Sequence, residues 1–155
     1  MSNHYFVDAG HANGFTLAAI AIRYTHLQCD GIELHDTRHA NSRSLKEHVV
    51  KLNAVNSDNI RFHKGNISDQ LFLYIYKRAT ILYMYDYRYH AETLNFIVNL
   101  LNSRTCRIQL LISSYPFKFW SPSCHVLCDT GKKIKGYFRN STECHNLYFY
   151  TVINE

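Results

Sequence analysis

The sequence has few of the residues that interrupt regular structure, with two prolines and six glycines among 155 residues. No apolar run approaches the roughly 18 residues that a membrane-spanning helix needs. The polar start, Met1–His4, lacks the charged and apolar regions of a signal peptide. These absences argue against a disordered, fibrous, membrane-bound or secreted protein. We therefore expect a soluble, intracellular protein with no membrane partner.

Cysteine occurs five times, an odd number that argues against a disulfide framework in a chain with no secretory features. We expect reduced thiols that pack as small core residues. Cys124, Cys128, Cys144 and His145 together offer the ligand types of a zinc site. Their spacing is loose, so we predict no metal site.

The chain is long enough to bury the core of one domain, and we predict a single domain over residues 1–155. Hydrophobic residues make up 46% and aromatic residues 14%, which predicts a core rich in tyrosine and phenylalanine. The formal charge of +5 and the pI of about 9.0 suit an acidic partner, such as nucleic acid or a nucleosome face. The densest basic run, Lys132, Lys133 and Lys135 with Arg139, is either a phosphate-contacting loop or a solvated hairpin.

Short apolar segments alternate with segments of helical spacing along most of the chain. The expected strands are Tyr5–Asp8, Cys29–Leu34, Ile60–His63, Thr80–Tyr85 and Arg107–Ile112. The expected helices are Phe15–Tyr24, Ser44–Leu52, Ser68–Tyr76 and Ala91–Leu101. Apolar runs of this kind are typical of strands buried on both faces of a parallel sheet. The sequence therefore predicts an α/β protein with a Rossmann-like, mostly parallel sheet flanked by helices.

Two local patterns refine this prediction. Ser44 and Glu47 have the spacing of a capping box, so we expect the second helix to begin at Ser44. Near the carboxyl end, His125–Cys128 and Leu147–Ile153 are β-rich with no room for a crossover helix, which predicts a C-terminal antiparallel strand pair. We expect a turn at Asp129–Gly131. Lys132–Gly136 either extends the first of these strands or forms a basic loop.

The first expected strand runs into a glycine turn, and this is the main functional pattern in the sequence. Asp8 ends the strand, and Gly10 and Gly14 lie within the turn. Glu33 follows about 20 residues after the turn, near the end of the second strand. Glycines bring backbone N–H groups close to a ligand, and an acid placed there can accept both hydroxyls of a ribose. The pattern predicts a site for a nucleotide-like cofactor.

Nearly the whole chain resembles the class I methyltransferases, which bind S-adenosylmethionine on a seven-stranded sheet. Their first acid and glycines match Asp8, Gly10 and Gly14, their ribose acid matches Glu33, and their adenine-contacting position matches Asn66. The resemblance implies that these residues, with His11, Leu34 and Ile67, hold S-adenosylmethionine. Asp8 would both order the turn and contact the cofactor.

The sequence departs from the family pattern at two of these positions. Ala12 stands where the family prefers its middle glycine, and a position that needs a positive φ would strain an alanine. Asn66 stands where an aspartate usually accepts the adenine amino group, a bond that an amide carbonyl can also accept. These departures motivate the alternative that the chain is a catalytically silent, methyltransferase-like module that binds a protein or a nucleic acid.

Within the class, the sequence is most similar to the disruptor-of-telomeric-silencing type of histone-lysine methyltransferase. Tyr85–Tyr89 looks like the loop after the fourth strand of that type, and Ser113–Phe117 looks like its Ser-Ser-x-Pro-Phe stretch. The resemblance implies an amine acceptor such as a protein lysine, with Asp86 accepting a hydrogen bond from it. Tyr87 and Tyr89 would line an aromatic channel that favours a cation.

Other acceptors and partners stay open. A base amino group remains an alternative, because Asp86-Tyr87 distantly resembles the acidic aromatic loop that binds such amines. A ribose hydroxyl is less favoured, since residues 1–4 contain no lysine for the Lys-Asp-Lys-Glu set used in that chemistry. Relatives carry helices before the first strand, so we expect a partner chain or a second copy to cover that side. Phe117, Phe119 and Trp120 either bind substrate or close the core.

Overall fold

Seven strands form one sheet in the computed structural model, which describes residues 4–85, 89–120, 122–137 and 144–153. The strands are β1 (Tyr5–Ala9), β2 (Gln28–Glu33), β3 (Ile60–Lys64), β4 (Ile81–Met84), β5 (Leu110–Ser113), β6 (Leu127–Tyr137) and β7 (Cys144–Val152). Their order is β3-β2-β1-β4-β5-β7-β6. The first five strands are parallel and β7 runs antiparallel to both β5 and β6. The predicted architecture is confirmed, including the C-terminal antiparallel pair.

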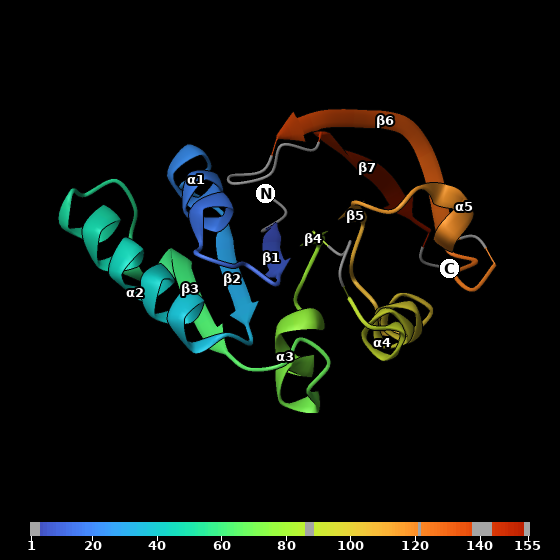
Figure 1. Cartoon of the computed structure of the whole chain (residues 1–155), viewed down its shortest axis with the longest axis horizontal. Coiled ribbons are helices and arrows are strands. Elements are labelled where there is room, and N and C mark those ends of the chain that lie inside the picture. Colours follow the sequence, from blue (N-terminus) through green and yellow to red (C-terminus); the bar gives the residue numbers. More distant parts are fainter. Residues whose placement is uncertain (1–3, 86–88, 121, 138–143, 154–155) are drawn as a thin grey trace.

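Helices cover both faces of this sheet (Figure 1). They are α1 (Phe15–Arg23), α2 (Asp36–Lys51), α3 (Leu73–Tyr76), α4 (Ala91–Leu101) and α5 (Phe117–Trp120), with 3-10 turns η1 (Ser57–Asn59) and η2 (Gln70–Phe72). α1 and α2 lie on one face, whereas α3 and α4 lie on the other (Figure 1). Among the described helices, none has the length and apolarity that crossing a bilayer requires.

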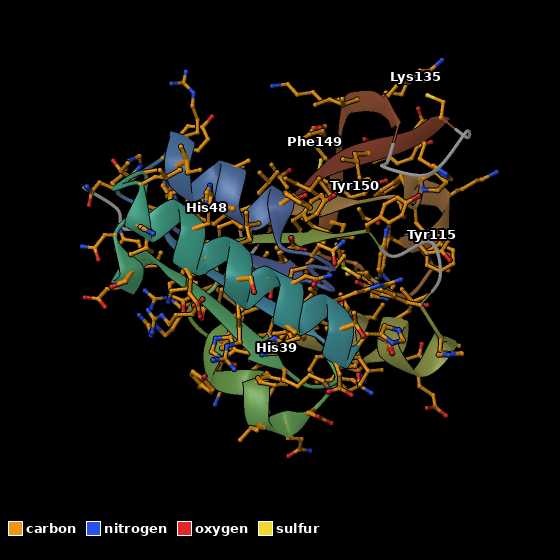
Figure 2. All side chains as sticks on the ribbon, turned by 60° about the vertical axis from the view of Figure 1, so that its left-hand side comes forward. His39, His48, Tyr115, Lys135, Phe149 and Tyr150 are labelled. Carbon is orange, nitrogen blue, oxygen red and sulfur yellow. The ribbon has the colours of Figure 1, made fainter. Side chains whose placement is uncertain are left out.

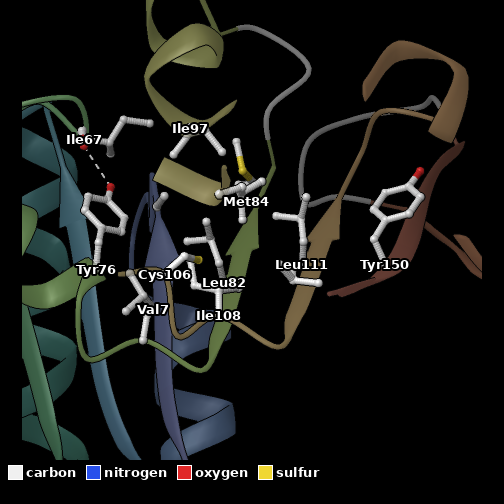
Figure 3. Packing of buried hydrophobic residues seen from close by; sticks show 14 of the residues in the cluster. Val7, Ile67, Tyr76, Leu82, Met84, Ile97, Cys106, Ile108, Leu111 and Tyr150 are labelled. Atoms are coloured by element: carbon white, nitrogen blue, oxygen red, sulfur yellow. Dashed lines mark hydrogen bonds between the residues drawn. The ribbon is translucent and has the colours of Figure 1, made fainter. Parts of the chain in front are cut away.

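The core divides into two clusters because side chains of a strand alternate between the two faces of a sheet. All of β1 is buried, yet Val7 belongs to the cluster beneath α3 and α4 while Phe6 belongs to the cluster beneath α1 and α2. Figure 3 shows the first cluster, in which Tyr76 from α3 donates a hydrogen bond to the carbonyl oxygen of Ile67 at 2.8 Å. Trp120 of α5 is also buried in this cluster. Of the two roles that the sequence left open for Trp120, binding substrate or closing the core, the structure shows the second.

The predicted start of the second helix is wrong. α2 begins at Asp36 and continues through Ser44, which therefore lies inside the helix rather than at its cap. Figure 2 shows one continuous helix carrying both His39 and His48. The first half of α2 is polar and largely exposed, so it lacks the apolar stripe by which a helix is recognised in a sequence. The local capping-box pattern at Ser44 was misleading for this reason.

Two further predictions changed in detail. The helix expected over Ser68–Tyr76 divides into η2 and the short α3. The turn expected at Asp129–Gly131 is instead an irregularity within β6, where the pairing with β7 shifts between Asp129 and Lys133. Gly131 adopts φ 71° there and its N–H bonds to Asp129 Oδ1 at 2.8 Å. β6 therefore continues through the lysine run, as one of the two sequence alternatives anticipated.

Candidate functional site

The glycine turn after β1 lies where the order of the parallel strands reverses. β1 pairs with β2 on one side and with β4 on the other, and open α/β sheets bind ligands beyond the carboxyl ends of strands at such a point. Gly10 and Gly14 adopt φ values of 86° and 81°. The N–H groups of Gly10 and His11 both bond to the Ile32 carbonyl, at 2.9 and 3.2 Å. These bonds attach the turn to the end of β2.

Ala12 has φ 50°, in the left-handed region that the sequence analysis identified as a source of strain. Its N–H donates to Glu33 Oε2 at 2.9 Å. The strained conformation therefore directs a backbone donor of the turn toward the acid that ends β2.

Glu33 is buried, and each of its carboxylate oxygens accepts one backbone N–H. Ala12 donates to Oε2, and His35 donates to Oε1 at 2.8 Å. Each oxygen retains a second lone pair. The side chain is consequently held in one orientation and can still accept hydroxyl groups, as a ribose acceptor must. Leu34, the next residue, is 54% exposed beside it.

Asp8 lies at the same edge of the sheet and is only 1% exposed. Its Oδ1 has no hydrogen-bond partner among the described residues. Burial raises the pKa of Asp8 to about 8, and the charge of Glu33 contributes in the same direction. Asp8 therefore holds a proton at neutral pH, and a cationic group placed beside it would stabilise its ionised form.

His11 points into the protein rather than toward solvent. Its ring packs against Phe62 with 4.7 Å between centroids, and a Cβ added to Gly31 would lie 2.7 Å from His11 Cδ2. Burial lowers the pKa of His11 to about 4. The neutral ring fills the space between the turn and β2. Its predicted contact with a cofactor stays a prediction.

Tyr89 reaches the turn from the segment that follows β4. Its hydroxyl donates a hydrogen bond to the Ala9 carbonyl, and a Cβ added to Gly10 would clash with the same hydroxyl. The side chain thus occupies the space that the missing side chain of Gly10 leaves open. Sequence reasoning assigned Tyr89 only to an aromatic channel, and nothing in a single sequence signals this contact. Asp86 and Tyr87 lie outside the described residues, so their catalytic role stays a prediction.

The loop after β3 is the third part of the site. Gly65 N–H donates to the Glu33 carbonyl at 3.0 Å, which brings this loop beside the acid. Asn66 Oδ1 accepts hydrogen bonds from the Ser68 backbone N–H and hydroxyl, at 3.1 and 2.9 Å. Ile67 is buried in the core. The amide oxygen expected to bind adenine therefore orders its own loop here.

The four residues considered for zinc are spread along the C-terminal strands. Cys124 is buried before β6, and Cys128 pairs with Thr151 near one end of the hairpin. Cys144 pairs with Tyr137 at the other end of the same hairpin. The register thus separates two of the possible ligands by most of the length of β7.

The residues at this edge fit S-adenosylmethionine in three respects. Asp8 offers an unpartnered carboxyl to a cationic amino group, Glu33 offers lone pairs to a ribose, and the turn offers glycines with positive φ. An obstacle among the described residues is the Tyr89 hydroxyl beside Gly10, which would have to move. Of the predicted cofactor residues, the structure brings together Asp8, Gly10, Gly14 and Glu33, with the Asn66 loop adjoining.

No model of a known protein family and no curated protein sequence matches this chain. Solved structures do resemble it. An RNA methyltransferase from Salinibacter ruber, in complex with S-adenosyl-L-homocysteine, has a TM-score of 0.62 and 13% identity, over 98% of this chain and 82% of that one. TrmK from M. capricolum, in complex with S-adenosyl-homocysteine as its natural cofactor product, has a TM-score of 0.64 and 10% identity, over 97% of this chain.

The methyltransferase domain of a bacterial CtHen1 also resembles this chain, with a TM-score of 0.64 and 11% identity, over 96% of this chain and 90% of that one. This chain spans 63% of the length of TrmK. These similarities show that the chain has the fold of the class I methyltransferases.

Proposed function

We propose that this protein is an S-adenosylmethionine-dependent methyltransferase. The observation that carries the proposal is the pair of buried carboxyl groups, Asp8 and Glu33, at the carboxyl ends of adjacent strands on either side of the glycine turn. An isolated buried carboxyl without a partner is unfavourable, so a fold that only needed a core would gain nothing from Asp8 Oδ1 at this position. A cofactor with a cationic amino group and a ribose would satisfy both residues.

When bound, S-adenosylmethionine supplies an electrophilic methyl group. The residues of the chain then have to orient the cofactor and position the methyl acceptor. Glu33 would accept the ribose hydroxyls, while the N–H groups of Ala12 and His35 hold its carboxylate in place. Asp8 would hold the cationic amino group through Oδ1, because a positive charge beside it favours the ionised carboxylate. Asp86 and Tyr87, directly after Tyr85, are the residues that we assign to the acceptor side.

The acceptor that we propose is an amine. The likeness of Tyr85–Tyr89 and Ser113–Phe117 to the histone-lysine type supports a protein lysine. The structural similarity to an RNA methyltransferase supports an acceptor in RNA instead, where a base amino group would be the amine. All five cysteines are free thiols, which supports an intracellular location as part of this proposal.

Isothermal calorimetry with S-adenosylmethionine and S-adenosylhomocysteine tests the proposal. We expect the wild type to bind both ligands and Glu33→Gln to bind each at least about tenfold more weakly, because one ribose acceptor is lost. Glu47→Gln is the matched control, since Glu47 is an exposed residue of α2. Absence of binding by a folded wild type would refute the proposal.

A specific observation favours a second candidate, the catalytically silent module. Tyr89 fills the space beside Gly10 and His11 fills the space beside Gly31. Tyr89→Phe removes the hydroxyl that contacts Gly10, and the exposed Tyr24→Phe is its control. If the site binds the cofactor, Tyr89→Phe should tighten binding by a few-fold. Without its hydrogen bond to Ala9, the ring at position 89 would occupy the space beside Gly10 for less of the time. If neither protein binds the cofactor, the silent module is the better description.

A further inference from the structure

The outer half of the β6–β7 hairpin is a basic arm, which we define as Lys132–Tyr137 with Cys144–Tyr148. Its three lysines, Lys132, Lys133 and Lys135, are all exposed. Figure 2 shows Lys135 pointing away from the body of the protein. Neither segment of the arm contains an aspartate or a glutamate. The ion pairs of the described residues also leave these lysines uncompensated.

Strand register places the basic arm relative to the candidate site. Ala9 pairs with Met84, Met84 with Ser113, Ser113 with Tyr148, and Tyr148 with Lys133. This row crosses the sheet from the end of β1 to the arm. Four strand spacings of about 4.8 Å give roughly 19 Å between its two ends. In the register of the sheet, Lys133 thus lies in the row that begins at the end of β1, just before the glycine turn.

Lys133 and Lys135 lie on one face of the hairpin, and Lys132 lies on the other. Residues paired across two antiparallel strands lie on the same face, so Lys133 shares its face with Tyr148 and Lys135 shares it with Asn146. Lys135 lies two residues past Lys133, or about 7 Å farther beyond the edge. A backbone of phosphates that follows the arm would meet both lysines in turn.

An aromatic row continues from the basic arm on this face. Tyr148 stacks with Tyr150 at 6.5 Å between centroids, and Tyr150 contacts Phe117 at 6.0 Å. The Tyr150 hydroxyl donates to the Tyr115 carbonyl at 2.7 Å, and the Tyr115 ring stacks on Phe119 at 3.9 Å. Phe119 is 42% exposed at the end of this row. The row therefore runs from Tyr148, on the face of Lys133, through the buried Tyr150 to the exposed ring of Phe119.

We propose that the basic arm, together with the exposed Phe119 ring, binds a single-stranded nucleic acid. Lys133 and Lys135 contact its phosphates, and a base stacks on Phe119. Exposed cations bind the phosphates of a single strand, and an exposed aromatic ring offers a surface on which an unpaired base can stack. This inference rests on the proposed function in one respect, because it names nucleic acid as the class of methyl acceptor.

Fluorescence anisotropy with a labelled single-stranded RNA of about 12 nucleotides tests the arm. The triple variant Lys132→Ala, Lys133→Ala and Lys135→Ala should bind at least about tenfold more weakly, and the slope of log K against log salt should become shallower by about 1.4, or about 0.7 for each of the two phosphate contacts. The matched control removes three positive charges from α2, at Arg38, Arg43 and Lys51, all of which are exposed. Equal losses in the two variants would overturn the proposal, since only net charge would then matter.

The aromatic row has its own test. Phe119→Ala should weaken binding of the single strand by about tenfold and leave binding of a duplex of the same sequence unchanged, because duplex bases are already stacked. Tyr74→Ala on α3 is the control, since Tyr74 is 51% exposed. An arm variant that lost binding to polyglutamate but not to RNA would assign the surface to an acidic protein and overturn the proposal.

Calorimetry with S-adenosylmethionine on the same arm variant separates the two proposals. The arm variant should keep the cofactor affinity of the wild type, because the arm lies about 19 Å from the turn. RNA binding without cofactor binding would leave the nucleic-acid surface in place and refute the methyltransferase. Cofactor binding without RNA binding would support the methyltransferase and refute the nucleic-acid surface.

Discussion

Asp8 and Asp30 are both 1% exposed, but they differ in their hydrogen bonding. Asp30, in the middle of β2, accepts a hydrogen bond from the Tyr5 hydroxyl and lies 2.5 Å from His63 Nε2. Arg61 Nε is 3.9 Å from the same carboxylate. Asp8, at the end of β1, has an oxygen with no partner among the described residues.

The difference shows what each carboxyl group is suited to do. Burial and the neighbouring Asp30 both raise the pKa of Tyr5, so the phenol stays protonated and donates. Both Asp30 oxygens therefore have partners without any ligand, and this acid serves the fold. At the carboxyl edge, by contrast, Asp8 Oδ1 lacks a partner among the described residues and would gain one only from a bound group. Burial alone does not distinguish a structural acid from a binding acid, whereas hydrogen-bond satisfaction does.

Removing Asp30 should have the largest effect on stability. Asp30→Ala leaves the Tyr5 hydroxyl buried and His63 and Arg61 without their carboxylate, which should cost about 3–5 kcal/mol of unfolding free energy. Urea denaturation measures it. Asp36→Ala is the control, because Asp36 is 95% exposed in its pair with Lys64 and should change stability little. Similar small losses in both variants would mean that the Asp30 cluster does not hold the fold together.

Asp8 should appear instead in the pH dependence of stability. Its pKa is about 8 in the folded protein against an ordinary value of 3.8, so the folded state binds the proton more tightly. The stability that this confers is fully present below pH 4 and is lost as the pH rises toward 8. His11 opposes this, because its lowered pKa of about 4 makes stability rise with pH only up to about 6.5.

Between pH 6.5 and 8, therefore, Asp8 acts without opposition from His11. Unfolding free energy should fall across this window, by as much as ~1.4 kcal/mol per pH unit. Asp8→Asn should remove the decline, and urea denaturation at several pH values measures both proteins. An unchanged slope in the variant would show that Asp8 is ionised in the folded protein and that a partner for it exists.

This contrast also explains how far the sequence could predict the structure. The alternation of strands and helices and the spacing from Gly10 to Glu33 are local patterns, and they placed the fold and the turn correctly. The start of α2 was missed because the helix is stabilised at few positions, with Val49 and Ser42 its buried residues. Contacts between distant residues were beyond reach. Tyr89 on Gly10 joins residues almost 80 positions apart, and no pattern within one sequence encodes such a pair.

Backbone strain supplies the smallest and most local test of the comparison. Ala12 at the carboxyl edge has φ 50°, whereas Tyr5, Asp30 and His63 lie within regular strands. A left-handed alanine costs roughly 1–2 kcal/mol, and the greater freedom of an unfolded glycine offsets about 0.4–1 kcal/mol of that. Ala12→Gly should therefore stabilise the protein by about 0.5–1 kcal/mol, measured as a shift of the urea midpoint.

Asn53→Gly is the matched control for Ala12→Gly, because Asn53 has φ 54° in the loop after α2. Asparagine tolerates the left-handed region better than alanine, so this variant should change stability less. If Ala12→Gly destabilised the protein, the N–H of residue 12 would depend on the alanine to stay directed at Glu33 Oε2, and the strain would be part of how the site holds its acid. If it stabilised the protein as expected, the carboxyl edge would contain both an unpartnered buried carboxyl oxygen and a strained backbone. Both features cost stability, as is expected of a site that is kept for binding.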